Sequence, residues 1–427
     1  MGRSRYLHAV HPGPDGGSDG LDPEEPEALL ECLVGVSERI GRDAVLFAMD
    51  DLSAIAVARI APMLQGRFRL PHQPDGLPAR VADKAELSRL CARWDIPHPE
   101  TVIPAGGTEA ADAAWRLGLP VIAKWSRPWL LPTGTDLRST ALLRTAAEAR
   151  RLYERSAEAG SRLLLQRFLP AGADTDWFFH GAFARGGRPL LVGSGRKELS
   201  WPVRTGLTAV GRWLPDPAVE EAGLRIAERL GYHGILDLDF RRDERGCFRL
   251  VDFNPRPGAQ FRLFADAAGL DVVQAMYLDL TGQRVPEPSG GPGRVFVAEN
   301  YALLAAVRGG SLPRRREPAV AVAAAAATGG GRAEVEAAWF AADDPLPFLA
   351  MLAAFLGRGA GKGVRALRGV PAHGRRTARA VARAPRQRGR ELPPAAPGGP
   401  APRPAPPTSS AESSAEPSAE PDELVTR

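Results

Sequence analysis

The sequence predicts a multidomain chain of mixed α/β and α+β structure, and three observations support this. The chain has 427 residues, more than one hydrophobic core usually organises, and 44% of them are hydrophobic. Residues 26–64 show helical, strand-like and again helical patterns, as in an α/β unit. Residues 234–254 hold two apolar runs separated by the turn-forming tetrapeptide Asp243–Gly246, which predicts a β-hairpin.

The predicted hairpin carries acids in an otherwise apolar setting. Because side chains alternate along a strand, Asp237 and Asp239 share one face, and Asp252 and Asn254 share another. Folding about the turn then brings Asp239 near Asp252 and Asp237 near Asn254. Carboxylates beside an amide oxygen suit Mg²⁺, and Arg256 adds a cation where phosphate would lie. Solvated acids on a surface hairpin are the alternative, but a buried acid among apolar neighbours needs a partner.

The hairpin resembles the metal-binding end of the ATP-grasp superfamily, whose members couple carboxylates to amines through acyl phosphates. Three further similarities follow in the family's order: Asp83-Lys84 at a helix start, Gly118–Lys124 and Leu163–Pro170. The resemblance extends from about residue 83 to residue 285. It is strongest to carboxylate–amine ligases of the D-aspartate ligase-like and carbamoyl-phosphate-synthase-like type. It implies ATP and Mg²⁺, or Mn²⁺ in its place, with Asp239, Asp252 and Asn254 as metal ligands.

The resemblance also implies contacts to the phosphates and to adenine. Lys124 ends an apolar strand and is expected at the α/β phosphates, with a solvent-facing strand end as the alternative. Lys84 has a similar implied role, although a lysine in the first turn of a helix is ordinary. Adenine is expected against the strand that carries Gln166, Phe168 and Leu169, which alternation alone could equally place in the core.

The ribose and the γ-phosphate have their own candidates. Asp174 and Asp176 are the nearest acids for the ribose hydroxyls, and we take Asp174. On a predicted strand, Leu190–Trp201, neighbouring Arg196 and Lys197 project to opposite faces, so only one can enter the cleft. Lys197 resembles the family's γ-phosphate contact and would stabilise charge during phosphoryl transfer.

Two loops are expected near the site. Val203–Ala209 fits the substrate side, with Arg204 either a carboxylate clamp or a surface arginine. The loop Trp125–Thr135 stands where the family has a glycine-rich lid, yet it holds one glycine and two tryptophans. Backbone N–H cradles for phosphate usually need glycine, so this lid either closes through Thr133–Thr135 or is reshaped.

The first 80 residues are expected to form an incomplete α/β domain. Its predicted elements are a helix at Pro26–Ile40, a buried strand at Ala44–Ala48 and a helix at Leu52–Leu64. The family's first domain opens with a strand, a glycine-rich turn and a helix, and Ser4–Tyr6 resembles a later point in it. We therefore expect either a truncated domain or a start upstream of Met1, with the Ala44–Ala48 strand poorly covered on one side.

The rest of the chain completes four predicted parts: the N-terminal domain (1–80), an ATP-grasp core (81–285), a small unit (286–357) that ends in an apolar helix at Leu346–Leu356, and a disordered tail (358–427). The tail has eleven Lys or Arg and no acid over 358–390, then a Pro/Ser/Glu-rich end, so it cannot build a core. A solvated linker is the first interpretation, and peripheral contact with anionic lipid is the alternative. No aromatic residue interleaves the arginines, so nucleic-acid binding is not expected.

Cysteine usage and the ends of the chain favour a cytoplasmic protein. Cys32, Cys91 and Cys247 are widely separated, which argues against a disulfide framework and a zinc site. The first 20 residues lack the apolar core of a signal peptide. The longest uncharged run of small apolar residues, Ala319–Ala327, is far too short to span a bilayer.

The sequence therefore predicts an ATP-dependent ligase acting on a small-molecule carboxylate and an amine, with Arg256 and Lys197 as catalytic residues. No convincing Ser-His-Asp or Cys-His set is present, and the implied chemistry needs no nucleophilic side chain. The alternatives are a kinase-like phosphotransferase on the same scaffold and a non-catalytic ATP-binding module that acts through its basic tail.

Overall fold

The structure is a computed structural model that describes residues 3–11, 13, 25–132, 134–172, 174–201, 206–266, 268–289, 293–308 and 335–368. The chain separates into two units, Met1–Arg365 and Ala366–Arg427. Only residues 366–368 of the second unit are described, so the described architecture belongs to the first unit.

The N-terminal region forms a small α/β unit. Its elements are α1 (Glu27–Ile40), β1 (Ala44–Val45), α2 (Asp51–Ile60), the 3₁₀ turn η2 (Ala61–Leu64) and β2 (Phe68–Arg69). Both helices agree with the prediction. The strand does not: it has two residues, both half-buried, because its partner β2 is equally short and the parallel pairing ends there. No other strand among the described residues joins this sheet.

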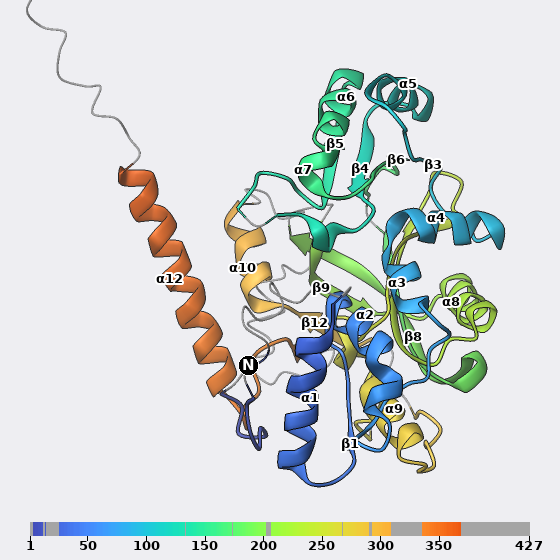
Figure 1. The fold of residues 1–427 in the computed structure, drawn as a ribbon. Coiled ribbons are helices and arrows are strands. Elements are labelled where there is room, and N and C mark those ends of the chain that lie inside the picture. Colours follow the sequence, from blue (N-terminus) through green and yellow to red (C-terminus); the bar gives the residue numbers. More distant parts are fainter. Residues whose placement is uncertain are drawn as a thin grey trace, which may run out of the picture. The chain divides into compact units, whose positions relative to one another are not determined.

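A four-stranded antiparallel sheet forms the first lobe. Its order is β3 (Thr101–Val102), β6 (Leu163–Arg167), β4 (Val121–Trp125) and β5 (Thr140–Leu143). Three helices pack against these strands (Figure 1): α5 (Gly107–Leu117), α6 (Ala146–Glu154) and α7 (Ser156–Ala159). Along β4, Val121, Ala123 and Trp125 are buried in the core shared with α5 and α6. Alternation therefore turns Lys124 to the opposite face of the sheet.

A seven-stranded sheet forms the second lobe. Its order is β11 (Phe248–Asn254), β10 (Gly234–Arg242), β7 (Asp176–Ala184), β8 (Arg188–Trp201), β9 (Leu207–Trp213), β12 (Val295–Val297) and β13 (Val335–Ala337). Every neighbouring pair is antiparallel except β12 and β13. Two further turns, η4 (Arg185–Gly187) and η5 (Phe261–Phe264), adjoin this sheet.

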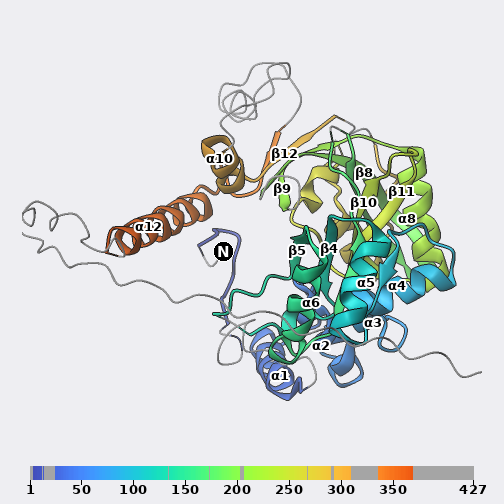
Figure 2. The ribbon, with the colours of Figure 1, turned by 90° about the horizontal axis from the view of Figure 1, so that it is seen from above.

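The two faces of this sheet pack against different helices. Phe179 belongs to the core shared with α8 (Pro217–Leu230), while Phe178 belongs to the core shared with α9 (Val272–Leu280). α8 lies beside β8 in both ribbon views (Figures 1 and 2). The approach of α8 is close, because a Cβ on Gly223 would lie 2.6 Å from the Phe179 ring.

The remaining elements connect or extend these units. They are α3 (Leu77–Ala82), α4 (Lys84–Arg93), η3 (Pro128–Leu130), α10 (Glu299–Arg308) and α12 (Leu346–Arg368). The helix α12 thus runs into the segment predicted to be unfolded, and the rest of that tail lies outside the described residues. Within the described part of the chain, none of the helices combines the length and the apolar character that a membrane span requires.

Candidate nucleotide and metal site

The hairpin β10–β11 has the register that alternation predicted. Asp237 pairs with Asn254, and Asp239 pairs directly with Asp252. The register slips beyond Asp239, toward the turn, so the acids lie on the regular side of the irregularity. Asp237 and Asn254 are buried, whereas Asp239 and Asp252 are half-buried and face a pocket.

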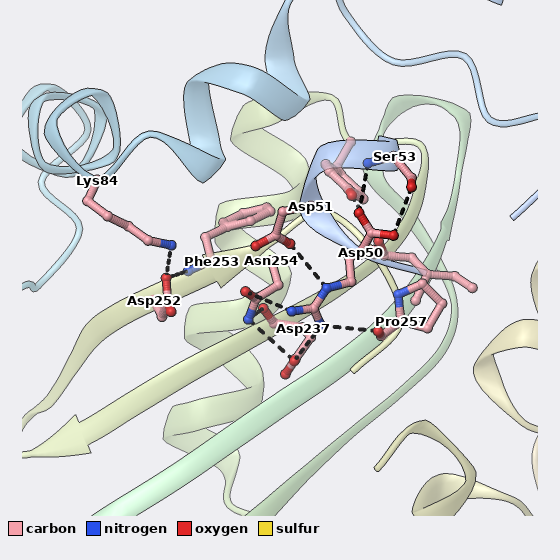
Figure 3. Close-up of polar contacts among 12 residues, drawn as sticks. Asp50, Asp51, Ser53, Lys84, Asp237, Asp252, Phe253, Asn254 and Pro257 are labelled. Atoms are coloured by element: carbon pink, nitrogen blue, oxygen red, sulfur yellow. Dashed lines mark hydrogen bonds and ion pairs between the residues drawn. The ribbon is translucent and has the colours of Figure 1, made fainter. Parts of the chain in front are cut away.

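Lysines from three different elements converge on this hairpin. The Lys84 ammonium, from the first turn of α4, contacts the Asp252 carboxylate (Figure 3). Lys197 of β8 lies 2.8 Å, Nζ to Oδ1, from Asp239. Lys124 of β4 donates to the carbonyl oxygen of Val251 at 2.7 Å. Each cation is therefore held at the hairpin by a contact with an oxygen atom of β10 or β11.

The N-terminus of α4 is tied to the end of β4, which keeps Lys84 close to Lys124. Asp83 caps the helix by accepting hydrogen bonds from the backbone N–H groups of Ala85 (2.9 Å) and Glu86 (3.2 Å). Its carboxylate also accepts from the Ser126 hydroxyl, just after β4. Burial would raise the pKa of Asp83, but these hydrogen bonds outweigh burial and hold it below its usual range.

Burial and neighbouring charge set the ionisation of the cluster. Burial lowers the pKa of Lys124 to about 8, although Asp252 opposes the shift. Burial alone would raise the pKa of Asp252, but the charges of Lys84 and Lys124 outweigh it, and the pKa is lowered. The pKa of Asp239 is raised, because burial and the nearby Asp237 outweigh Lys197. Lys197 itself has a raised pKa, since its acidic neighbours more than offset its burial.

One pocket between the two sheets brings together most of the predicted nucleotide residues. Those that line it are Lys124, Gln166, Leu169, Lys197, Asp239 and Asp252. Lys197 faces the pocket and Arg196 does not, which confirms the alternation argument for β8. Phe168 lies elsewhere, just after the end of β6, in the lining of a different hollow.

The acid expected to receive the ribose is not at the pocket. Asp174 lies outside its lining and forms an ion pair with Arg196 at 2.5 Å. Asp176, the alternative, lines the pocket instead and pairs with Arg241 at 2.6 Å. The difference arises because β7 begins at Asp176, so only this acid has strand geometry toward the pocket.

Arg241 is a pocket residue that the sequence reasoning missed. It lines the pocket, and its Nη1 donates to the carbonyl oxygen of Leu169 at 3.1 Å. It therefore ties β10 to the segment expected to hold adenine. Its position two residues after Asp239 was an available signal, because alternation puts both on one face.

Arg256 lies at the far end of the hairpin, in a second polar cluster. Its Nε donates to Asp51 at 3.1 Å, its Nη2 donates to Asn254 Oδ1 at 3.2 Å, and its Nη1 lies 3.6 Å from Asp237 Oδ2. Figure 3 shows Asp51 and Asp237 close to Asn254 at this end of the hairpin. Asn254 therefore presents its amide oxygen to Arg256, whereas Asp239 and Asp252 face the pocket.

A buried histidine supports this cluster from behind. The Nε2 of His180 lies 2.9 Å from Asp237 Oδ1, and both residues are buried. Burial would raise the pKa of Asp237, but His180 and Arg256 lower it below its usual range. Gly258 allows the approach, because a Cβ there would lie 2.5 Å from both side chains. Neither Asp51 nor His180 carries a local sequence signal.

No protein-family model matches the chain. A curated relative, the C-terminal section of the carbamoyl phosphate synthase large chain from Methanopyrus kandleri, is 26% identical over 238 residues, covering 52% of this chain and 42% of the relative. The chain thus spans less than half the length of that relative. The ADP complex of N5-carboxyaminoimidazole ribonucleotide synthetase superposes with a TM-score of 0.51 at 13% identity, over 70% of this chain and 76% of that one. The chain has the ATP-grasp fold.

Another solved structure is the biotin carboxylase domain of Hydrogenobacter thermophilus 2-oxoglutarate carboxylase, which contains MgADP, ADP and bicarbonate. It matches with a TM-score of 0.48 at 20% identity, over 61% of this chain and 58% of that one.

The oxygen atoms at the hairpin fit a magnesium–nucleotide complex. No group of three or more His, Cys, Asp or Glu side chains is arranged for a metal within the residues that the structure describes. Mg²⁺ in nucleotide sites commonly uses one or two carboxylates plus the phosphates, rather than an all-protein cage. The paired Asp239 and Asp252 supply two carboxylates, and the lysines beside them match the phosphates.

The loop Trp125–Thr135, which the resemblance places at the lid position, is anchored at its start. Trp125 is buried in the core of the first lobe. The next two residues are both held by Asp83, through the Ser126 hydroxyl and through Arg127 Nε at 3.0 Å. Any closing movement must therefore come from beyond Arg127. Two predicted contributors, Thr133 and Arg204, lie outside the described residues.

Proposed function

We propose that this chain is an ATP-dependent ligase that joins a small carboxylic acid to an amine through an acyl phosphate, with Mg²⁺ as the metal. The observation that carries the proposal is the convergence of three lysines on the hairpin. Lys84 and Lys197 pair with the carboxylates of Asp252 and Asp239, and Lys124 donates to the backbone carbonyl oxygen of Val251 beside them. Three cations match a triphosphate, and two carboxylates match its metal.

The ion pairs of the free protein have to exchange partners when the nucleotide binds. Lys84 would leave Asp252 for phosphate, and Lys197 would leave Asp239 for the γ-phosphate. Asp239 and Asp252 would then bind Mg²⁺, and Asn254 would become the third ligand only if its amide oxygen turned from Arg256 to the metal. Bound Mg²⁺ would neutralise the phosphate charge and polarise the γ-phosphoryl group. Mn²⁺, another hard cation, is the alternative.

The remaining nucleotide contacts are assigned to the pocket lining. Gln166 and Leu169 would lie against adenine, and Arg241 holds the Leu169 carbonyl group in place. We assign the ribose hydroxyls to Asp176 in preference to Asp174, because only Asp176 lines the pocket.

The reaction proceeds in two displacements. A carboxylate oxygen of the acid forms a bond to the γ-phosphorus while the bond from that phosphorus to the ADP oxygen breaks. Lys197 stabilises the charge on the transferring group, and Arg256 orients the acid. The amine nitrogen then attacks the acyl carbon, phosphate leaves with the bonding electrons, and the amine proton passes to solvent. No side chain acts as a nucleophile.

Trapping with hydroxylamine tests the proposal. The protein is incubated with MgATP and a panel of acids, with and without hydroxylamine, and ADP and hydroxamate are measured. We expect both products in stoichiometric amounts for the right acid. ADP without hydroxamate would favour a kinase-like phosphotransferase. Nucleotide binding with no ADP against any acid–amine pair would overturn the ligase and favour a binding module.

A further inference from the structure

A separate pocket lies beside Arg256, next to the residues that follow the β10–β11 hairpin. It is formed where β1, α2 and β2 of the N-terminal unit meet the start of β10 and the residues after β11. The N-terminal unit contributes Phe47 and Ala58, and the core contributes Ile235 and Arg256. The pocket is therefore composite, and neither part of the chain forms it alone.

The lining of this pocket is mostly apolar, and its walls include Leu46, Phe47, Val57, Ala58 and Ile235. Among the described residues that line it, Arg256 alone is charged, and Gln73 and Tyr232 are polar. An apolar pocket with one fixed cation selects a ligand that has one negative end and an uncharged body.

Arg256 has donors left for such a ligand. Its guanidinium carries five N–H groups. Three hydrogen bonds use part of this capacity: Nε to Asp51, Nη1 to the Pro257 carbonyl oxygen (3.1 Å) and Nη2 to Asn254. These contacts also fix the plane of the guanidinium, which is what a bidentate carboxylate contact requires.

Gln73 adds an unmet acceptor to the same pocket. Its Nε2 donates to the carbonyl oxygen of His233, which fixes the orientation of the amide. Its Oε1 is buried and has no hydrogen-bond partner within the described residues. A buried acceptor without a donor is unfavourable, so a small rotation of the amide toward the cavity, where a ligand N–H or O–H group could donate to it, would be stabilising. Gln73 lies close to the start of β10, because a Cβ added at Gly234 would lie 3.1 Å from Gln73 Nε2. Gly234 also has a φ of 133°, which favours glycine.

The size of the pocket limits the ligand. Its cavity volume is about 70 Å³. Since one water needs roughly 10–15 Å³ by this measure, the cavity accommodates roughly five to seven non-hydrogen atoms. A long, branched or aromatic side chain would have to extend out of the cavity into solvent or displace α2.

We propose that this pocket binds the acid substrate, and that the substrate is a small 2-hydroxy acid with a short apolar side chain. This inference rests on the proposed ligase function and names its acid. The carboxylate binds Arg256, the donor on carbon 2 meets Gln73 Oε1, and the side chain packs against Phe47 and Ala58. Because Arg256 also contacts Asn254 and Asp237, the carboxylate is held at the end of the hairpin that carries the metal ligands.

Binding without nucleotide tests the pocket independently of the reaction. Calorimetric titrations use 2-hydroxy acids and 2-amino acids with side chains of increasing length, the unsubstituted acids of equal length, and dicarboxylic acids. We expect the tightest binding for side chains of roughly one to three carbons. Longer chains, a second carboxylate or loss of the carbon-2 donor should each weaken binding about tenfold or more. Comparing the affinities of the 2-hydroxy acids with those of the 2-amino acids shows which donor on carbon 2 the pocket prefers.

Matched variants locate the binding. Ala58→Leu fills the pocket and should weaken binding of the best acid at least tenfold. Ala92→Leu makes the same change at an exposed position of α4 and should leave binding unchanged. Gln73→Leu should remove the preference for acids with a carbon-2 donor. If Ala58→Leu does not fold, Ala58→Val and the ligand series still decide the question.

The outcomes separate the pocket from the reaction. Tight binding of long or charged acids, or unchanged binding by Ala58→Leu, overturns the pocket assignment even if hydroxamate forms. Binding of short apolar acids that Ala58→Leu abolishes supports the pocket, and if such acids yield no hydroxamate with MgATP, the ligase function alone fails.

Discussion

The ammonium of Lys84 contacts the carboxylate of Asp252, although 168 positions separate the two residues in the sequence. A residue expected to bind phosphate thus neutralises a residue expected to bind metal. Lys197 and Asp239 repeat this arrangement at 2.8 Å. The pairs keep half-buried charges compensated in the free protein, where an unpaired charge would be costly. If the proposed function is correct, they also hold each side chain near the position from which it would bind phosphate or metal.

Asp252→Asn is predicted to abolish most ADP formation while leaving the fold intact. The variant keeps the shape of the side chain but removes one anionic metal ligand. We expect a loss of roughly 100-fold or more, because a metal ligand supports several kcal/mol of transition-state stabilisation and about 1.4 kcal/mol corresponds to tenfold. Glu244→Gln, at the exposed turn of the same hairpin, is the control. Near-normal turnover by Asp252→Asn would exclude the hairpin as the metal site.

Lys197 and Arg196 offer a matched pair for the γ-phosphate. They are neighbours on β8, but only Lys197 lines the pocket. Lys197→Met should lower kcat for ADP formation roughly 100-fold, in the range seen when a donor to developing charge is removed. Arg196→Met should change kcat little, although it loses its ion pairs with Asp174 and Glu198. Equal losses in both variants would contradict a specific role for Lys197.

Local patterns predicted the parts of the site that lie within one element or one hairpin. The pairing of Asp239 with Asp252 followed from alternation and a turn. Alternation also predicted that only one of Arg196 and Lys197 enters the cleft, and the choice of Lys197 came from the family resemblance. Contacts between distant elements could not be predicted in this way. Asp51 and Arg256 are 205 positions apart, and their contact depends on how α2 docks beside the end of β11. The short strand β1 was overestimated because an apolar run does not reveal the length of its partner.

The affinity for ATP is predicted to fall as the pH rises above about 8. Burial lowers the pKa of Lys124 to about 8 in the free protein. A bound phosphate favours the ammonium form and raises that pKa, so binding above pH 8 requires proton uptake. The Kd should therefore be flat below this pH and increase up to about tenfold per unit above it. Titrations between pH 7 and 9.5 at constant ionic strength measure the slope.

Lys124→Arg is the control for this pH dependence. An arginine stays protonated throughout the range, so the slope above pH 8 should disappear even if the affinity itself changes. An unchanged slope in Lys124→Arg would assign the titration to another group.

Asp51 is predicted to act on the acid substrate through Arg256 and not on the nucleotide. It stands in the first turn of α2 and accepts from Arg256 Nε at 3.1 Å, while Asp237 lies on the other side of the guanidinium at 3.6 Å. Asp51→Ala would leave the guanidinium held from one side only. We expect the KM for the acid to rise about tenfold, as for other losses of orientation, with the Kd for ATP within about twofold of the starting value. A double-mutant cycle decides whether the effect passes through Arg256: in an Arg256→Ala background, Asp51→Ala should raise the KM no further. Additive effects in the two variants, or a loss of ATP affinity in Asp51→Ala alone, would show that Asp51 acts by another route.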